Sequence, residues 1–313
     1  MNARTEEKSW IEQMGRIAVL MGGTASEREI SLKSGAAVLN ELLRMGLYAE
    51  PFDPAERAIS ELSSFDRAFI VLHGKGGEDG VMQGVLESLK VPYTGSALLA
   101  SALAMDKLRS KQFWEGAGLP TPPFRLLQRG CDLAEIVEQL GLPLMVKPVC
   151  EGSSIGMAKV DTVEALRQAW EVASEYEGEV IAEQWVEGAE YTVAILGDRA
   201  LPMIRLQTSH RFYDYEAKYS AEDTEYLCPC GLNSEQERQL QQLAHSAFST
   251  LGCSGWGRVD LMVDQAGSPW LLEVNTVPGM TDHSLVPMAA SAAGLDFQQL
   301  VLAILEASYE AGN

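Results

Sequence analysis

Short apolar runs alternate with amphipathic stretches in the first third of the chain. The runs RIAVLM (16–21) and RAFIVL (67–72) each lead into a glycine-rich stretch, so we expect two buried strands that end at turns. Between them, apolar residues recur at helical spacing over 31–44, which predicts a helix with one apolar face. This order predicts a parallel sheet with ligand-binding loops at the carboxyl ends of its strands.

The same patterns continue through the rest of the chain, with a proline cluster at 119–124 ending one helical stretch. The further predicted elements are a helix over 98–118, strands over 143–148 and 179–186, a helix over 161–176, strands near 191–196 and 201–206, and helices near 234–251 and 296–309. A long polar segment, 207–229, shows no clear period. Its length favours a functional lid over a passive connection.

The hairpin predicted from RVDLMVD (258–264) and WLLEVN (270–275) carries the most specific chemistry. Side chains alternate faces along a strand, so Arg258 and Asp260 share one face, and Glu273 and Asn275 share one face of the partner strand. If these faces coincide, two carboxylates and an amide oxygen lie together, and Mg²⁺ prefers such ligands. A solvated polar hairpin face is the alternative, but the irregular segment NTVPGMT that follows Asn275 counts against it.

Lys147 ends a predicted strand beside the small-residue loop EGSSIG. A lysine next to backbone N–H groups and hydroxyls can hold ATP phosphates, although this spacing is neither a Walker A sequence nor a dinucleotide fingerprint. From composition alone, Lys107 is a surface lysine. The loops GGTASEREIS (22–31) and HGKGGEDG (73–80) fit ligand loops and tight turns equally well.

The chain is acidic, with 24 Lys and Arg against 44 Asp and Glu and a formal charge of −20. This balance argues against a nucleic-acid partner, because nonspecific binding depends on Lys and Arg that neutralise phosphates. No apolar run approaches the roughly 20 residues of a membrane-spanning helix. The N-terminus, MNARTEEKSWIEQ, lacks the apolar core of a signal peptide. We expect a cytoplasmic enzyme with no membrane partner.

The five cysteines are scattered along the chain. Only Cys228 and Cys230 are close in sequence, and no second Cys/His pair stands at a spacing typical of zinc sites. We expect reduced thiols that serve mainly in packing.

Several segments, in their order along the chain, resemble the D-alanine–D-alanine ligase family: HGKGGEDGVMQG, PYTGS, AMDKLRSK, VKPVCEGSSIGM, EYTVAILG, FYDYEAKY, GWGRVDLMVD and LLEVNTVPGMTDHSLVP. The resemblance runs from about Arg16 to Glu306. It implies an α/β ATP-grasp fold, in which an N-terminal parallel-sheet domain is followed by central and C-terminal α+β lobes that clamp ATP. The implied boundaries are 1–100, 101–190 and 191–313.

The resemblance also implies the reaction: ATP-dependent ligation of two D-alanines through a D-alanyl phosphate, for peptidoglycan precursor synthesis. The cofactors implied are ATP and two Mg²⁺ ions, for which Mn²⁺ can substitute. Asp260, Glu273 and Asn275 become the metal ligands, in agreement with the hairpin pattern. The implied ATP contacts are Lys107, Lys147 and Lys218 for the phosphates, Glu183 and the backbone near Val186 for adenine, and Glu190 for the ribose.

On the substrate side, the resemblance implies a hydrogen-bonded set of Glu27, Ser153 and Tyr219 that couples a lid to the first D-alanine. The lid would contain Lys218 and Tyr219. The other implied substrate contacts are His73 near the first D-alanine, Arg258 and the N–H of Gly279 as an oxyanion pocket, and Ser284 and Leu285 at the carboxylate of the second D-alanine. A homodimer is the expected assembly.

The sequence departs from the family pattern at a few loop positions. Val149-Cys150 stands where relatives often have Ser-Arg, and Val277 and Asp282 stand where small hydroxyl residues are common. None of these residues is assigned to catalysis. Two alternatives stay open: a D-alanine–D-lactate ligase, against which Tyr219 counts, and a nucleotide-binding regulatory protein on an inactive scaffold, against which the retained Asp260, Glu273 and Asn275 count.

Overall fold

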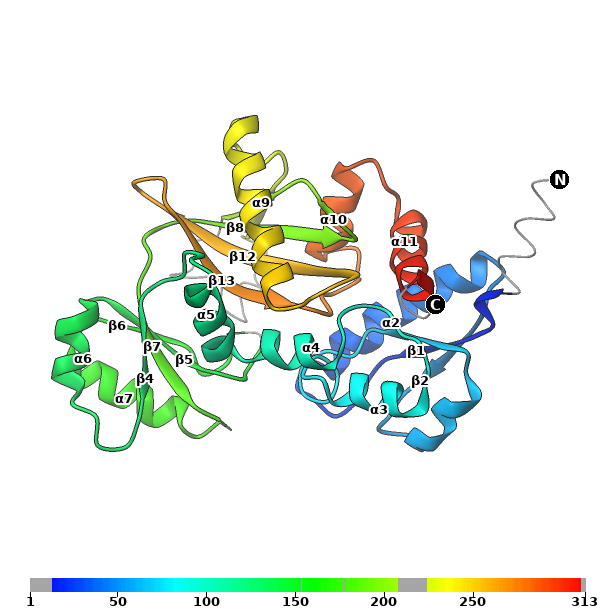
Figure 1. Cartoon of the computed structure of the whole chain (residues 1–313), viewed down its shortest axis with the longest axis horizontal. Coiled ribbons are helices and arrows are strands. Elements are labelled where there is room, and N and C mark those ends of the chain that lie inside the picture. The colour runs from blue at the N-terminus through cyan, green and yellow to red at the C-terminus, as the bar shows by residue number, and fades with distance from the viewer. Residues whose placement is uncertain (1–12, 153, 177, 208–223, 311–313) are drawn as a thin grey trace.

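Three β-sheets organise the chain, as the computed structural model shows (Figure 1). The structure describes residues 13–152, 154–176, 178–207 and 224–310. Within them the sheets have three, four and six strands. Helices connect and cover the sheets, and the polypeptide passes from the first sheet to the second, and then to the third.

The first sheet is parallel, as predicted. Its strands are β1 (Arg16–Leu20), β2 (Tyr48–Phe52) and β3 (Arg67–Ile70), in the order β2-β1-β3. The connecting helices are α2 (Arg28–Arg44), the 3₁₀ helix η1 (Ile59–Ser64) and, after β3, α3 (Val81–Leu89). All four residues of β3 are buried, which explains why its sequence is apolar after Arg67.

The helix predicted over 98–118 is wrong in one respect, because it is two helices: α4 (Leu98–Met105) and α5 (Lys107–Gly116). The chain turns at Asp106, which has an extended conformation and accepts a hydrogen bond from the Arg109 N–H at 2.9 Å. This side chain caps the first turn of α5, and a cap of this kind stabilises a new helix start. The break places Lys107 at the beginning of α5.

The second sheet is antiparallel and has the order β4-β7-β5-β6. Its strands are β4 (Phe124–Leu127), β5 (Leu144–Pro148), β6 (Ala158–Val160) and β7 (Val180–Gln184), and its helices are α6 (Leu133–Leu140) and α7 (Val163–Ala173). Apolar side chains from both helices pack against one face of the sheet and form a separate core. The polar side chains of Lys147 and Glu183 do not belong to this core.

The third sheet has the order β11-β10-β8-β12-β13, with β9 paired to β8. Its strands are β8 (Gly188–Leu196), β9 (Arg199–Ala200), β10 (Ile204–Gln207), β11 (Glu225–Leu227), β12 (Trp256–Asp264) and β13 (Pro269–Asn275). Helix α9 (Ser234–Thr250) packs on one face, and α10 (Leu285–Ala292) and α11 (Phe297–Glu310) follow the hairpin. Of the predicted lid 207–229, residues 208–223 lie outside the described residues.

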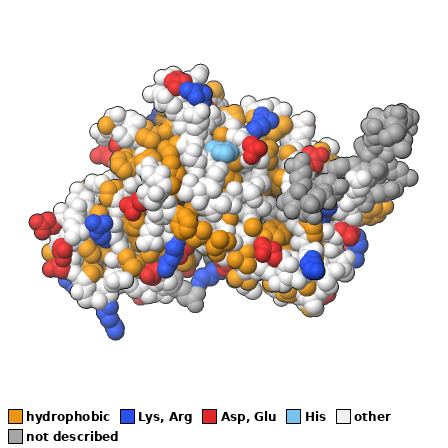
Figure 2. All heavy atoms as spheres, in the orientation of Figure 1, with side chains coloured by type: hydrophobic (Ala, Val, Ile, Leu, Met, Phe, Trp, Pro, Cys, Tyr) orange, Lys and Arg blue, Asp and Glu red, His pale blue; other side chains and the backbone are white. Residues whose placement is uncertain are grey.

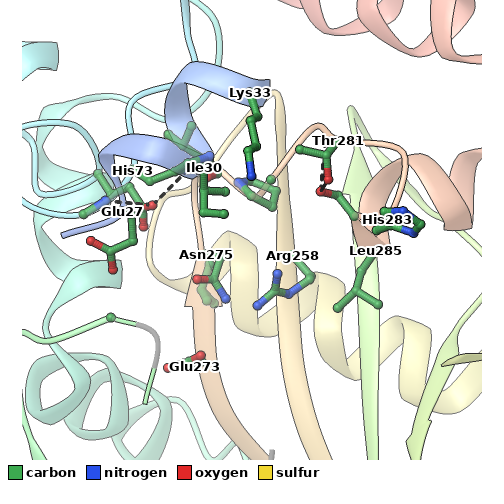
Figure 3. A pocket seen from close by; sticks show the side chains of 18 of the residues that line it. Glu27, Ile30, Lys33, His73, Arg258, Glu273, Asn275, Thr281, His283 and Leu285 are labelled. Carbon is green, nitrogen blue, oxygen red and sulfur yellow. Dashed lines mark hydrogen bonds and ion pairs between the residues drawn. The ribbon is translucent and has the colours of Figure 1, made fainter. Parts of the chain in front are cut away.

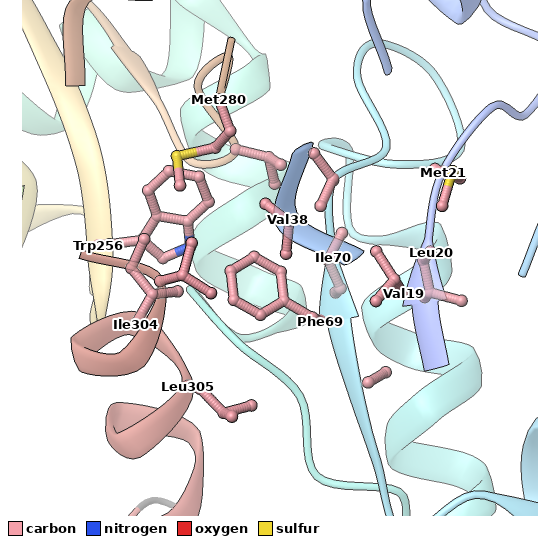
Figure 4. Close-up of a cluster of buried hydrophobic side chains, with 14 of the residues drawn as sticks. Val19, Leu20, Met21, Val38, Phe69, Ile70, Trp256, Met280, Ile304 and Leu305 are labelled. Carbon is pink, nitrogen blue, oxygen red and sulfur yellow. The ribbon is translucent and has the colours of Figure 1, made fainter. Parts of the chain in front are cut away.

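The core of the first sheet includes the end of the chain (Figure 4). Ile304 and Leu305 of α11 belong to the same buried cluster as Val38 of α2 and Phe69 of β3, and Trp256 of β12 joins it. A buried hydrogen bond from the Arg67 guanidinium to the Ser308 hydroxyl, 3.2 Å long, adds a polar contact. The predicted boundaries at 100 and 190 stay a prediction. This core joins residues before the first boundary to residues after the second.

Lys and Arg side chains are scattered singly over the face shown in Figure 2, rather than gathered into one patch. Within the described part of the chain, no single helix is long and apolar enough to cross a membrane. Residues 285–292 and 297–308 reach the required length and hydropathy only as a pair, bent by 106°. Both segments contribute side chains to the buried core of the first sheet.

Candidate active site

Two cavities are lined by residues of the β12–β13 hairpin. The larger cavity, of about 600 Å³, is lined by these predicted residues: Glu27, His73, Lys107, Arg258, Glu273, Asn275, Gly279, Ser284 and Leu285. The smaller cavity, of about 280 Å³, is lined by Lys147, Glu183, Val186, Glu190, Asp260 and Glu273. The structure thus separates the residues predicted for substrate from most of those predicted for the nucleotide. Glu273 lines both cavities, so they meet at its carboxylate.

The hairpin register brings the predicted metal ligands together. Arg258 lies opposite Asn275, and Asp260 lies opposite Glu273, so the two polar faces coincide. The buried Asp260 carboxylate accepts hydrogen bonds from Arg258 Nε (2.8 Å), Arg258 Nη2 (2.7 Å) and Asn275 Nδ2 (3.2 Å). The Thr192 hydroxyl on β8 donates a fourth bond of 2.6 Å. These contacts hold the carboxylate in place between the cavities.

Residues Asp260, Glu273 and Asn275 suit a hard divalent cation. They offer two carboxylates and an amide oxygen on one face of the hairpin, and Arg258 and Lys107 neutralise those carboxylates in this structure. In the described residues, no group of three or more His, Cys, Asp or Glu side chains is arranged to hold a metal by itself. The donor set therefore fits Mg²⁺ whose shell is completed by nucleotide phosphates.

Lys107 connects the hairpin to the loop EGSSIG, contrary to the expectation of a surface lysine from composition. Its ammonium group lies 3.3 Å from a Glu273 carboxylate oxygen and donates a 2.7 Å hydrogen bond to the Glu151 carbonyl. Its backbone N–H donates to the Val149 carbonyl at 3.1 Å. Because Asp106 starts α5 at this point, Lys107 is held at the junction of the loop and the hairpin.

A second group of charges is sealed between α5 and the second sheet. Lys111 and Lys147 both form ion pairs with the Glu183 carboxylate, Lys111 at 2.7 Å, and none of the three is more than 5% exposed. Burial raises the pKa of Glu183, but the two ammonium groups outweigh this and hold it below its usual value. Burial lowers the pKa of Lys111, and Glu183 offsets this only in part.

Lys111 is a functional-site residue that the sequence prediction did not assign. It lies four residues after Lys107, on the same face of α5, and its ammonium group also donates to the Thr121 hydroxyl at 2.7 Å. The i, i+4 spacing of the two lysines in AMDKLRSK indicates only that both lie on one face of a helix. The sequence prediction did not assign Thr192 either, because its contact with Asp260 depends on β8 pairing with β12.

The first D-alanine is predicted to contact Glu27, which lies where three loops meet. An added Cβ at Gly74 would stand 2.6 Å from Glu27 Oε2, and one at Gly152 would stand 2.8 Å from Oε1. A side chain at either glycine would therefore displace the carboxylate. The Ser26 hydroxyl donates a 2.8 Å hydrogen bond to Glu27 Oε2. Glycines in HGKGG and EGSSIG thus allow the close approach, and Gly74 also has a positive φ of 67°.

His73 lies beside Glu27, and residues 281–285 form the other wall of the larger cavity (Figure 3). His73 Nδ1 lies 2.8 Å from the Val277 carbonyl, so this nitrogen carries the proton. Ser284 Oγ accepts a 3.0 Å hydrogen bond from the Thr281 N–H, and Gly279 lines the same wall. Ser284 immediately precedes α10, where unpaired backbone N–H groups favour an anion.

Three of the predicted site residues cannot be placed. Ser153, Lys218 and Tyr219 lie outside the described residues, so the roles expected of them stay predictions. Val186 and Glu190 also line the smaller cavity, and their contacts to adenine and ribose stay predictions. Glu183 lines this cavity too, but its carboxylate is engaged by two lysines, so its predicted contact with adenine stays open.

The chain matches the family models described as D-ala D-ala ligase N-terminus, over residues 48–96, and D-ala D-ala ligase C-terminus, over residues 113–306. It is 58% identical over 312 residues to the D-alanine–D-alanine ligase of Nitrosococcus oceani, which covers 99% of this chain and 98% of that one. The corresponding ligase of Stutzerimonas stutzeri is 59% identical over 304 residues, 96% of this chain and 97% of that one.

The fold is also similar to that of a solved structure. The crystal structure of a Bacillus anthracis D-alanine–D-alanine ligase complexed with ATP superposes with a TM-score of 0.84 and 33% identity, over 95% of this chain and 98% of that one. The ATP-grasp architecture expected from the sequence is confirmed. The chain belongs to the D-alanine–D-alanine ligase family.

Proposed function

We propose that this chain uses ATP to join two D-alanines into D-alanyl-D-alanine through a D-alanyl phosphate, as a step in peptidoglycan precursor synthesis. One observation carries the proposal. The smaller cavity collects the residues predicted for the nucleotide, the larger cavity collects those predicted for the amino acids, and both reach Glu273. Phosphoryl transfer between two substrates needs such a meeting point.

ATP occupies the smaller cavity in this proposal. Its base lies toward Val186, and its phosphates lie toward Lys147 and the hairpin carboxylates, where Lys107 approaches from α5. Asp260, Glu273 and Asn275 would hold Mg²⁺, which when bound neutralises phosphate charge. The lysines supply further positive charge, and positioning with charge neutralisation is most of what phosphoryl transfer requires.

The first D-alanine occupies the larger cavity with its ammonium group toward Glu27 and its carboxylate toward the hairpin. The carboxylate oxygen attacks the γ-phosphorus of ATP, the bond from that phosphorus to the bridging oxygen breaks, and ADP leaves. The product is an acyl phosphate, whose carbonyl carbon is a good electrophile. Ser153, Lys218 and Tyr219, outside the described residues, complete the proposed closure that excludes water at this stage.

The second D-alanine then attacks the acyl carbon through its unprotonated amine. The bond from that carbon to the phosphate oxygen breaks, inorganic phosphate leaves, and the nitrogen loses a proton. The developing oxyanion would be stabilised by the Arg258 guanidinium and the Gly279 N–H, which line the same cavity, and one such donor is often worth about 3 kcal/mol. Arg258 now pairs with Asp260. A cation bound to Asp260 would weaken that pairing, which frees Arg258 for the oxyanion.

Two assays test the proposal. Phosphate release from ATP and Mg²⁺ should require D-alanine in a panel of D- and L-amino acids and D-lactate, and hydroxylamine should intercept a D-alanyl hydroxamate. Dipeptide formation without any hydroxamate would contradict the acyl phosphate route. Faster phosphate release with D-lactate or D-serine than with D-alanine as the second substrate would contradict the assignment of D-alanine as the nucleophile.

The proposal extends to a cytoplasmic location and a homodimer. Light scattering coupled to size exclusion tests the assembly, since a dimer of this chain has twice its mass of 34.1 kDa. Fractionation of the native cells tests the location.

A further inference from the structure

Lys111 is a buried cation for which the proposed mechanism has no direct use. It lies on α5, one turn after Lys107, and its side chain is fully buried. Its two charged neighbours, Glu183 and Lys147, both line the smaller cavity. Lys111 is therefore closed off from water but lies directly behind charges that a nucleotide in that cavity can reach.

A chain of hydrogen bonds fixes the Lys111 ammonium group in place. It donates to the Thr121 hydroxyl at 2.7 Å, and this hydroxyl donates its own proton to the Leu271 carbonyl of β13 at 2.9 Å. The Leu271 N–H donates to the Pro120 carbonyl, also at 2.9 Å, so residues 120–121 are bonded to the hairpin in both directions. Lys111 cannot turn toward the cavity without breaking these contacts, and it can act on a nucleotide only through Glu183 and Lys147.

The charges of these three residues do not balance. Two ammonium groups share one carboxylate, Lys111 at Glu183 Oε2 and Lys147 at Oε1. The low pKa of Glu183 keeps this carboxylate ionised. The Lys111 ammonium group lies 2.7 Å from each of two oxygen atoms, Glu183 Oε2 and Thr121 Oγ1, which favours its charged form. One positive charge is left over, and Lys147 is the cation that lines the cavity.

We propose that Lys111 is a positioning residue for ATP, which offsets the charge of Glu183 so that Lys147 keeps a positive charge for the nucleotide phosphates. This inference rests on the proposed function, in which those phosphates lie toward Lys147. Without Lys111, Lys147 and Glu183 would form a neutral pair. The carboxylate would then hold the Lys147 ammonium group and repel the phosphates, and both effects are strong where water is partly excluded.

The test measures nucleotide binding in the presence of Mg²⁺, which needs no D-alanine. In folded Lys111→Met, the dissociation constants of ATP and ADP should rise about tenfold, in line with a lost charge-assisted contact. That of adenosine, which has no phosphate, should change less than twofold. Arg167→Met, which removes an exposed positive charge from α7, should match wild type for all three ligands. Calorimetry measures ATP and ADP, and competition with a labelled ATP analogue measures adenosine.

A double variant separates charge balance from packing. Lys111→Met combined with Glu183→Gln again leaves Lys147 as an excess positive charge. ATP should therefore bind more tightly to the double variant than to Lys111→Met. A role in packing alone predicts the opposite order, because a second substitution in the same buried group adds to the damage of the first.

Equal ATP binding by wild type and Lys111→Met would overturn the inference, as would a loss of the same factor for adenosine. A double variant that binds ATP more weakly than Lys111→Met would overturn it too. If Lys111→Met does not fold, Lys111→Gln, which keeps a hydrogen-bond donor beside Thr121, decides by the same criteria. A wild type that binds ATP but forms no dipeptide would contradict the proposed function, while the comparison of ATP binding would still decide the role of Lys111.

Discussion

The two groups of charges beside the β12–β13 hairpin differ in how they are closed off from water. Lys111, Lys147 and Glu183 are sealed between α5 and the second sheet, with Lys111 fully buried. Lys107 and Glu273 form a pair that opens on both cavities, and the Glu273 side chain is 24% exposed. Removing one partner from a buried ion pair greatly lowers the free energy of unfolding. Exposed charges can exchange partners with little change in that free energy. We infer that the sealed group holds the lobe in shape and presents Lys147 to the smaller cavity, whereas the open group lies where the two cavities meet.

The largest expected effect is on catalysis at the open group. Asp260→Asn or Glu273→Gln should lower the ligation rate on the order of 10³-fold, since each removes an anionic oxygen that faces the phosphates. Circular dichroism should show an unchanged fold. Glu171→Gln, at an exposed position of α7, is the matched control and should keep wild-type activity. Near-wild-type turnover in either hairpin variant would remove the basis of the metal assignment.

The next effect is on stability at the sealed group. Glu183→Gln leaves two buried ammonium groups without a carboxylate, and loss of one partner from a buried ion pair costs about 3–5 kcal/mol. Lys111→Met, by contrast, leaves Lys147 and Glu183 as a balanced pair and should cost clearly less. Urea denaturation of both variants measures the difference. Equal losses would mean that packing, not charge balance, governs this cluster.

The stability that Glu183 contributes should depend on pH. The pKa of Glu183 lies below its usual 4.5 in the folded protein, because Lys111 and Lys147 outweigh burial. The unfolded chain therefore binds more protons, so the stabilisation is complete above about pH 4.5 and is lost as the pH falls through the lower folded value. Urea midpoints measured from pH 7 to pH 3 should fall more steeply in wild type than in Glu183→Gln. Parallel curves would show that Glu183 does not titrate in this range.

The smallest effect tests how firmly the open group is held. Thr192→Val removes the 2.6 Å hydrogen bond to Asp260 without changing the shape of the side chain, at a cost of about 1 kcal/mol. Arg258 and Asn275 still hold the carboxylate. The concentration of Mg²⁺ needed for half-maximal activity should rise a few-fold with little change in kcat at saturation. A large loss of kcat would show that Thr192 contributes to the reaction itself.

Local patterns predicted the hairpin site because strand alternation and one pairing register determine which side chains share a face. The parallel first sheet was also predictable from local patterns, since each of its predicted strands is a short apolar run followed by glycines. The break at Asp106 was not predicted, because apolar residues at helical spacing continue on both sides of it. The resemblance assigned site residues that periodicity could not, such as Glu27 and Ser284, and the cavities bring these together.

The inward role of Lys111 could not be found from local features alone. Its partner Glu183 is 72 residues away and faces it only because β7 lies beside β5 in the second sheet.

The shared core of the first sheet and α11 has a consequence for how the protein is made. Val38 and Phe69 are synthesised more than 200 residues before the Ile304 and Leu305 side chains that complete their cluster. Until then the nascent first sheet exposes an apolar face, and domains in such a state are prone to misassembly. Helix α11 therefore has to be translated before the first-formed strands are fully protected.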